Sequence, residues 1–192
     1  MAAATQISVT EYLNAVYRPE RDYVDGQVLE RNLGERDHSQ PQALLAAYFL
    51  ARRKEWGLWA LTEQRVQVMP HRFRTPDVCV LRANAPYEQI VSAPPLICIE
   101  ILSKDDSFAS IVDRLDDYLA MGVANVWVID PRLRRGYRYN TDGVSRSHGW
   151  SSSNFGSGVR GAADGDFRLK GLLGGVQKFG DYGPKLHGLD RL

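Results

Sequence analysis

Residues 96–130 read LICIEILSKDDSFASIVDRLDDYLAMGVANVWVID, and this segment contains the strongest patterns of secondary structure in the chain. Its first run, LICIEIL, is apolar and β-branched with almost no alternation, which predicts a central strand buried on both faces. From 107 to 121 the apolar residues recur at helical spacing, and Gly122 lies where a helix ends in a C′ glycine. The run VANVWVID predicts a second buried strand. Strand, helix and strand in this order predict a βαβ-like unit, with a right-handed crossover if the strands are parallel.

The other predicted elements follow from capping and turn residues and from the periodicity of apolar residues. Hydroxyl caps precede a helix, Asp-Gly between β-rich runs indicates a hairpin, and a Pro ends a helical pattern. These elements are a helix from Ser8 to Arg18, a hairpin at Asp25-Gly26, a helix over 38–55, strands within 58–69, a turn over 71–75, a strand over 77–81, and a strand from 134 that ends in a turn before 143. The mixture of helices and strands predicts an α/β fold with an N-terminal helix and hairpin.

Composition places the chain among ordinary globular proteins. Its 192 residues are 44% hydrophobic and 24% charged, with a net charge of +1, so a nucleic-acid partner would need a local basic patch. Cys79 and Cys98 each lie in an apolar run and are expected to be core thiols in a reducing compartment. Neither a signal peptide nor an apolar stretch of about 18 residues occurs, so we expect a cytoplasmic protein without a membrane span.

The composition and periodicity of the sequence change after residue 142. Twelve of the 17 glycines lie between Gly143 and Gly188, and the segment has no sustained helical or strand periodicity. We therefore predict one domain over 1–142 and an irregular or poorly ordered tail over 143–192.

Two acidic residues carry the functional hypothesis. Asp77 opens a strand, and Glu100 lies within the buried run LICIEIL, where an ionised carboxylate needs compensation. A bound cation is one solution, since two carboxylates and a backbone carbonyl suit Mg²⁺ or Mn²⁺. The alternative is that Asp77 caps a turn and Glu100 forms a structural ion pair with Arg114.

Basic residues near these acids are candidates to stabilise the negative charge of a phosphate. Lys104 follows the strand of Glu100, Arg114 shares the inward face of the next helix, and Arg74 precedes the Pro-Asp turn. His38, at a helix start, could contact a phosphate or the metal, but a capping or surface role is favoured. Residues 52–54 could line a DNA groove, but a solvated helix end is favoured. The alternating Arg and Tyr residues of 132–139 could contact nucleic acid or protect an edge strand.

Six ordered motifs resemble one known family. They are DYVDGQVLE (22–30), His38 before a helix, TPDVCVL (75–81), PPLICIEILSKDDS (94–107), DRLDDYLAMGV (113–123) and VWVIDP (126–131). Together they resemble the Uma-type family of restriction endonuclease-like proteins, a domain family of unknown function in the PD-(D/E)XK nuclease superfamily. The resemblance covers residues 8–142. It implies a restriction-endonuclease-like core, in which helices flank a central mixed sheet and the metal site lies at one end.

The resemblance also implies roles for individual residues. Asp77 and Glu100 correspond to the metal-binding acids, and Asp22 matches a position where the family usually has Glu. The sequence departs from the family pattern at Leu102, where the second motif should have Lys, and at Arg114, where the resemblance implies a helix lysine that takes the place of that Lys. Arginine keeps the charge but cannot act as a proton-transferring base. Lys104, in place of the usual Pro, could supply a cation.

The leading hypothesis is therefore a metal-dependent endonuclease, with DNA as the favoured substrate. Asp77, Glu100, Asp22 and the Ile101 carbonyl would bind Mg²⁺ or Mn²⁺, while Arg114 or Lys104 stabilises the transition state. The alternative is a nuclease-fold protein that no longer cleaves and acts by binding nucleic acid or protein. A homodimer using the apolar parts of the first hairpin and helix is a third possibility.

Overall fold

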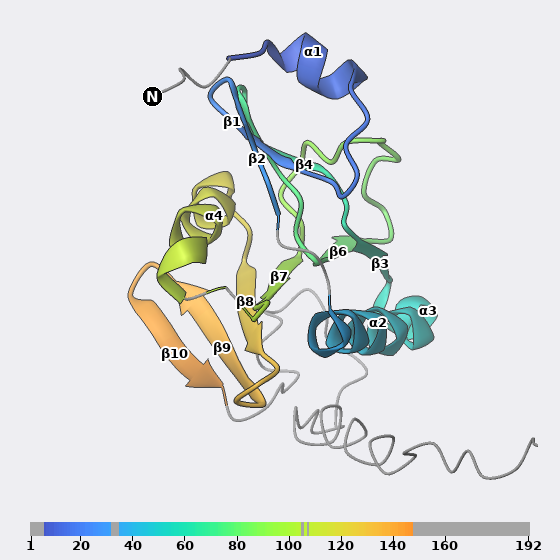
Figure 1. Ribbon diagram of the computed structural model, residues 1–192. Helices are drawn as coiled ribbons and strands as arrows, with labels where there is room; N and C mark the ends of the chain where they lie inside the picture. The colour runs from blue at the N-terminus through green and yellow to red at the C-terminus, as the bar shows by residue number, and fades with distance from the viewer. Residues whose placement is uncertain (1–5, 32–34, 105, 107, 148–192) are drawn as a thin grey trace, which may run out of the picture.

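The fold is built on two β-sheets. A computed structural model of the chain describes residues 6–31, 35–104, 106 and 108–147 (Figure 1). The six-stranded sheet has the order β10-β9-β8-β7-β6-β3, and the four-stranded sheet has the order β2-β1-β5-β4. The strands of the six-stranded sheet are β3 (Leu58–Thr62), β6 (Val78–Arg82), β7 (Ile97–Ile101), β8 (Asn125–Asp130), β9 (Arg135–Asn140) and β10 (Gly143–Ser147). Those of the four-stranded sheet are β1 (Asp22–Val24), β2 (Gln27–Leu29), β4 (Val66–Met69) and β5 (Arg72–Arg74).

The predicted βαβ unit forms the centre of the larger sheet. Strands β7 and β8 pair in parallel, and helix α4 (Phe108–Met121) connects them. Every residue of both strands is buried, as their unbroken apolar runs predicted. Gly122 has φ +97°, and its N–H and that of Val123 donate to carbonyls of the last helical turn. This Schellman-type end turns the chain directly into β8.

Helices cover both faces of the larger sheet, as predicted (Figure 1). Helix α2 (Arg36–Ala51), continued by the short α3 (Arg53–Trp56), packs Leu45 and Phe49 on one face. Helix α4 packs Ile111, Leu115 and Tyr118 on the other. Since side chains alternate along a strand, Ile99 and Ile101 lie in the α2 layer, while Glu100 is directed toward α4. The central position of Glu100 is therefore set by strand periodicity.

The four-stranded sheet begins with the predicted hairpin. Helix α1 (Val9–Asn14) starts with a capping box between Ser8 and Glu11. Strands β1 and β2 are joined by Asp25 and Gly26, which have φ of +48° and +95°. Positive φ at both positions is what a tight two-residue hairpin requires, so the Asp-Gly prediction is confirmed.

The predicted turn over 71–75 is wrong. Residues 72–74 form strand β5, which pairs with β1 and β4, and the turn is confined to Pro70 and His71. The run Arg-Phe-Arg has the alternation of a short strand, with Phe73 buried against Tyr12 and Tyr23. Its basic residues suggested a loop because their buried acid partners are distant in sequence.

The larger sheet continues past residue 142, the predicted domain boundary. Residues 143–147 form β10, which pairs with β9 in antiparallel register. Gly143, with φ +106°, completes the turn, and backbone pairing needs no hydrophobic periodicity. The rest of the predicted tail, 148–192, lies outside the described residues. Within the described part of the chain, no helix is long and apolar enough to cross a membrane.

Candidate active site

Asp77 lies at the end of the larger sheet, beside Glu100. Strands β6 and β7 are antiparallel, and Val78 pairs with Ile99. Asp77 precedes Val78 and Glu100 follows Ile99, so the two acids lie toward the same end of neighbouring strands. The Ile101 N–H donates to Asp77 Oδ2 at 2.6 Å, Arg31 Nη2 donates to Oδ1 at 2.5 Å, and His38 Nε2 lies 3.2 Å from Oδ2. Burial raises the pKa of Asp77, but the bond from His38 and the charge of Arg31 outweigh it, and the net pKa is lowered. Asp77 is therefore held as a carboxylate.

Glu100 is equally buried but differently compensated. Its Oε1 accepts a hydrogen bond from the Tyr118 hydroxyl at 2.7 Å, and its Oε2 accepts one from Arg114 Nη1 at 2.7 Å. Burial raises the pKa of Glu100 above its ordinary value despite the charge of Arg114. The structural ion pair with Arg114, considered as the alternative from the sequence, is thus present in the structure.

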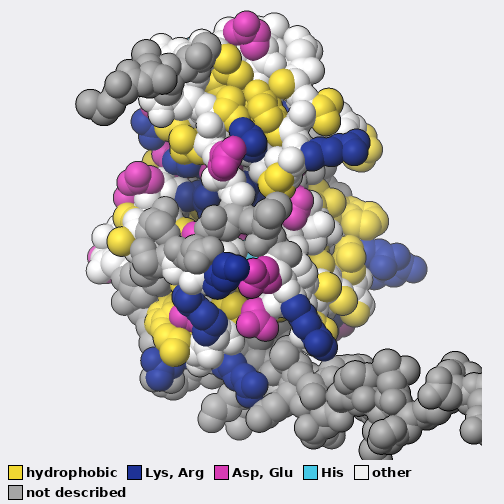
Figure 2. Space-filling model, in the orientation of Figure 1, with side chains coloured by type: hydrophobic (Ala, Val, Ile, Leu, Met, Phe, Trp, Pro, Cys, Tyr) yellow, Lys and Arg dark blue, Asp and Glu magenta, His cyan; other side chains and the backbone are white. Residues whose placement is uncertain are grey.

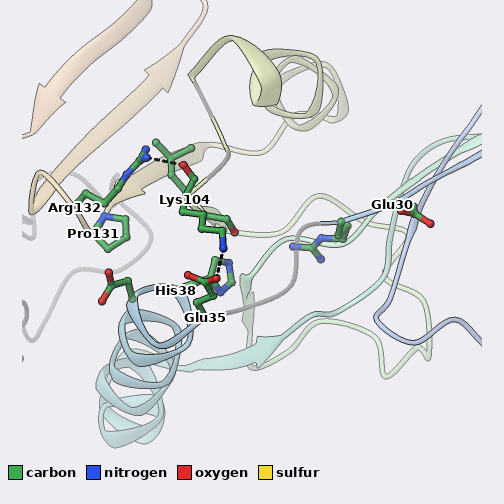
Figure 3. Close-up of a pocket in the computed structure, with 10 residues that line it drawn as sticks. Glu30, Glu35, His38, Lys104, Pro131 and Arg132 are labelled. Carbon is green, nitrogen blue, oxygen red and sulfur yellow. Dashed lines mark hydrogen bonds and ion pairs between the residues drawn. The ribbon is translucent and has the colours of Figure 1, made fainter.

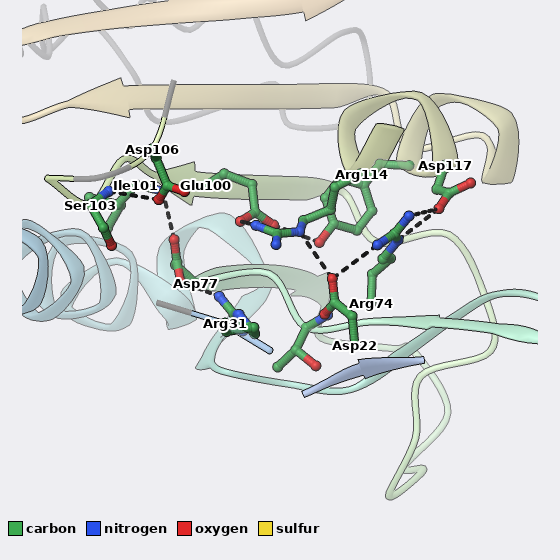
Figure 4. Close-up of polar contacts among 12 residues, drawn as sticks. Asp22, Arg31, Arg74, Asp77, Glu100, Ile101, Ser103, Asp106, Arg114 and Asp117 are labelled. Atoms are coloured by element: carbon green, nitrogen blue, oxygen red, sulfur yellow. Dashed lines mark hydrogen bonds and ion pairs between the residues drawn. The ribbon is translucent and has the colours of Figure 1, made fainter. Parts of the chain in front are cut away.

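Asp22 links Arg114 to a second arginine (Figure 4). Asp22 Oδ2 accepts hydrogen bonds from Arg114 Nε and Arg74 Nη1, both at 3.1 Å, and Oδ1 accepts one from the Thr75 N–H. Arg74 also pairs with Asp117 at 2.6 Å. Asp22 therefore lies behind Glu100 and fixes the guanidinium of Arg114.

A cavity opens beside Asp77 and Arg114. Its volume is about 220 Å³, and its lining residues are Glu30, Arg31, His38, Asp77, Ile101, Ser103, Asp106 and Arg114. A neighbouring cavity of about 380 Å³ extends between the start of α2 and the segment after β7 (Figure 3). On the face shown in Figure 2, basic and acidic side chains are intermixed rather than segregated. This face therefore offers no broad basic patch among its described side chains for binding phosphate.

Lys104 lies away from the acid pair. Its Nζ pairs with Glu35 at 2.6 Å at the rim of the larger cavity, and its side chain is 62% exposed. Of the two basic candidates, only Arg114 has an ion pair with Glu100 among the described contacts. Ile101 lies at the site as predicted, although the contact described is through its N–H and not the carbonyl.

Two residues at the site had no clear signal in the sequence. For His38 the sequence favoured a cap or surface role over contact with a phosphate or the metal, but its side chain is buried, with 9% exposure, and contacts Asp77 because α2 begins beside the start of β6. Arg31 follows the first hairpin and was not singled out at all. Arg31 and Asp77 are 46 residues apart, so no local spacing relates them. For Tyr118, the helical stripe indicated burial but not the bond to Glu100.

The other basic segments have structural partners. Arg52 stacks on Tyr48, with its guanidinium carbon 3.8 Å from the ring centroid. On β9, Tyr137 and Tyr139 pack against the α4 layer, and the Tyr139 hydroxyl donates to Asp116 at 2.6 Å. These tyrosines are therefore engaged with the protein's own core, which weakens the idea that they stack on bases.

The donor chemistry of the acids can be compared with the needs of a divalent cation. Asp77 and Glu100 provide carboxylate oxygens, the ligands that Mg²⁺ and Mn²⁺ prefer. Among the described residues, no group of three or more His, Cys, Asp or Glu side chains is arranged to hold a metal ion. Asp22 in particular is directed to two arginines. The donor types at Asp77 and Glu100 fit such a cation, and Arg31 and Arg114 compete for the same oxygens.

Comparison with known proteins places this site in a family. The Uma2 family, described as "Putative restriction endonuclease", matches residues 10–156. The chain belongs to the Uma2 family. The match includes both sheets, the acid pair and strand β10, and it confirms the resemblance found in the sequence motifs.

A solved structure supports the same fold. A crystal structure from Anabaena variabilis, described as a "putative nuclease", has a TM-score of 0.73 at 20% identity, covering 88% of this chain and 98% of that one. A cryoEM structure of a DrdV–DNA complex has a TM-score of 0.34 at 17% identity, covering 75% of this chain and 11% of that one, and carries no argument. None of the curated proteins matches this chain. The Uma2 chain thus has a nuclease-like α/β fold.

Proposed function

We propose that this Uma2 protein is a metal-dependent endonuclease that hydrolyses phosphodiester bonds of nucleic acid, with DNA as the favoured substrate. The observation that carries the proposal is the pair of buried acids, Asp77 and Glu100, at one end of the sheet with Arg114 beside them. Membership of a family described as restriction endonucleases supports it. Burying two carboxylates together is unfavourable, and Asp77 and the Glu100 partner Arg114 line a cavity, so we interpret the placement of the acids as a sign of function.

In this proposal each residue has a distinct role. Asp77 and Glu100 would hold Mg²⁺ or Mn²⁺, with the Ile101 carbonyl as a further oxygen ligand. When bound, such an ion polarises a phosphate oxygen and lowers the pKa of a coordinated water. Arg114 would stabilise negative charge on the phosphate, since its guanidinium is permanently charged and can form two parallel hydrogen bonds. Asp22, instead of binding metal, would position Arg114 through the Nε contact at 3.1 Å.

Cleavage assays test the proposal directly. Plasmid DNA would be incubated with the protein and Mg²⁺, Mn²⁺ or a chelator. We expect metal-dependent cleavage that is lost in Asp77→Asn and Glu100→Gln. Asp130→Asn is a matched control, because Asp130 is also a buried acid but serves as a cap for the Leu133 N–H and does not line the cavities. Absence of cleavage of DNA and RNA with either metal would contradict the proposal.

A second function is favoured by the ion pairs of the acids. Arg31 and Arg114 already compensate Asp77 and Glu100, and Leu102 replaces the lysine expected from the family motif. A protein in this state could bind nucleic acid or protein without cleaving. Nucleic-acid binding that persists in Asp77→Asn, together with no cleavage by the wild type, would support this alternative. Homodimer formation stays a prediction that sedimentation can test.

A further inference from the structure

Arg31 occupies the junction of the cavities around Asp77. It lines the cavities of about 380 Å³, 70 Å³ and 220 Å³, and its side chain is only 11% exposed. An arginine is rarely buried to this extent without a specific partner. Its described partner is Asp77, the acid that the proposed function assigns to the metal.

The contacts of Asp77 are divided unequally between its two oxygens. Oδ2 accepts the Ile101 N–H at 2.6 Å and lies 3.2 Å from His38 Nε2, whereas Arg31 contacts Oδ1. Loss of the Arg31 contact would leave Oδ2 held by two groups, one of them backbone. The Asp77 carboxylate can therefore keep its orientation while Arg31 moves to another anion.

The site has a polar atom without a partner in the described part of the chain. His38 Nδ1 is buried and has no hydrogen-bond partner among the described residues, and His38 lines the same three cavities as Arg31. Buried polar atoms in folded proteins are nearly always paired, with water or ligand where the protein offers nothing. An unpaired nitrogen beside an arginine indicates that this wall of the cavities meets a polar ligand.

Arg31 and Arg114 flank the acid pair from different segments. Arg114 comes from α4 and contacts Glu100, while Arg31 follows β2 and contacts Asp77. A phosphodiester has two non-bridging oxygens, and guanidinium groups match such oxygens with paired N–H donors. Two arginines on two sides provide a complementary arrangement for one phosphate group or for adjacent ones.

We propose that Arg31 is a phosphate-binding residue whose guanidinium exchanges the Asp77 Oδ1 contact for a phosphate of a bound nucleic-acid strand, with His38 and the Ile101 N–H keeping Asp77 in place. This rests on the proposed function for the nature of the substrate. Arg31 then supplies the cation missing at Leu102, and it does so from a different segment of the chain. His38 acts as a positioning residue for Asp77.

Salt dependence of binding separates this role from a structural one. A fluorescein-labelled DNA duplex would be titrated by anisotropy in chelator, from 50 to 200 mM salt, so that no cleavage occurs. Each phosphate contact contributes about 0.9 to the slope of log K against log salt. We expect Arg31→Gln to reduce the magnitude of this slope by about 0.9, which corresponds to one phosphate contact. The affinity ratio of wild type to variant should then change about 3.5-fold over this fourfold range of salt concentration.

Two controls keep the test independent of folding. Arg72→Gln removes an arginine that also bridges carboxylates, those of Asp25 and Asp117, but lines none of these cavities, and its slope should equal that of the wild type. Arg31→Gln in an Asp77→Asn background removes the uncompensated buried acid and should lose the same slope. Arg31→Lys should restore it. Equal slopes for wild type and both Arg31→Gln variants would overturn the inference.

The binding and cleavage results are separable. Wild type that binds DNA, loses one contact in Arg31→Gln and never cleaves would support Arg31 as a phosphate ligand while contradicting the endonuclease. Cleavage by the wild type combined with an unchanged salt slope in Arg31→Gln would support the endonuclease and contradict Arg31 as a phosphate ligand. Failure of the wild type to bind DNA at any salt concentration in this range would overturn the inference for Arg31.

Discussion

Replacing Arg114 with Met should reveal how much the buried acids depend on it. Arg114→Met preserves the length of the side chain but removes the 2.7 Å contact to Glu100 and the 3.1 Å contact to Asp22. Asp22 retains Arg74 and the Thr75 N–H, whereas Glu100 retains the Tyr118 hydroxyl. The substitution therefore removes charge compensation mainly from Glu100.

The expected magnitude follows from the burial of the pair. Glu100 is 2% exposed, and removing one partner of a buried ion pair typically costs about 3–5 kcal/mol. Because Tyr118 still donates to Glu100, we expect a loss near the lower end, about 3 kcal/mol in the free energy of unfolding. Glu100→Gln alone should cost about 1–2 kcal/mol. The double variant should be more stable than Arg114→Met alone, giving a coupling energy of about 2 kcal/mol.

The pH dependence provides an independent check. Burial already raises the pKa of Glu100, and loss of Arg114 removes the largest influence that lowers it. A carboxyl group with a raised folded-state pKa reduces stability above its unfolded value, and the penalty disappears as the folded protein takes up a proton. The destabilisation of Arg114→Met should therefore shrink as pH falls from 7 toward the ordinary Glu value of 4.5.

Urea unfolding followed by tryptophan fluorescence measures these differences, since Trp127 is buried in the core. The wild type, both single variants and the double variant form a complete cycle. Arg114→Lys, which keeps a positive charge, serves as a folded reference if Arg114→Met is too unstable at pH 7. A loss below about 1 kcal/mol for Arg114→Met, with no rescue by Glu100→Gln, would refute the reasoning because it would mean that the buried charge needs no partner.

Three further changes test other contacts. Tyr118→Phe removes the 2.7 Å hydrogen bond to Glu100 and should cost about 1–3 kcal/mol in urea unfolding; no measurable loss would show that the bond does not stabilise the fold. Although burial lowers the pKa of His38, its bond to Asp77 raises the net pKa, so the stability advantage of wild type over His38→Gln should be full below the ordinary His pKa of 6.5 and decline as pH rises through the raised folded-state pKa; a constant difference would contradict this. Gly122→Ala places a side chain at φ +97° and should destabilise by about 1 kcal/mol, lowering Tm by about 2–4 °C; an unchanged Tm would argue against strain at this helix end.

Several parts of the site followed from the sequence. Glu100 stood out because a charge inside an unbroken apolar strand needs compensation, and Arg114 because it shares the inward face of a helix. Both arguments use short-range repeats of about two to four residues along a strand or helix. In the structure, Arg114 Nη1 donates to Glu100 Oε2 at 2.7 Å. Asp77 was identified by the motif it resembles as well as by its place at a strand start.

The contacts around these residues in the structure differ from those that the sequence suggested. Asp22 was expected among the metal ligands but contacts Arg74 and Arg114, and Lys104 was expected near the acids but pairs with Glu35. The sequence could not separate these outcomes because each involves segments dozens of residues apart. Which cation reaches which acid depends on the packing of the two sheets and on where the loops cross their ends.

The βαβ unit, the Asp-Gly hairpin and the glycine end of α4 follow from local sequence patterns. These features depend on interactions within a few residues, such as strand alternation, helical spacing and positive φ. The tertiary structure was needed to show that β5 and β10 are strands, because their pairing partners supply the hydrogen bonds that their own patterns do not indicate. It also decided that Arg31 and His38 meet at Asp77, since sheet register and the entry of α2 bring together donors that no local pattern connects.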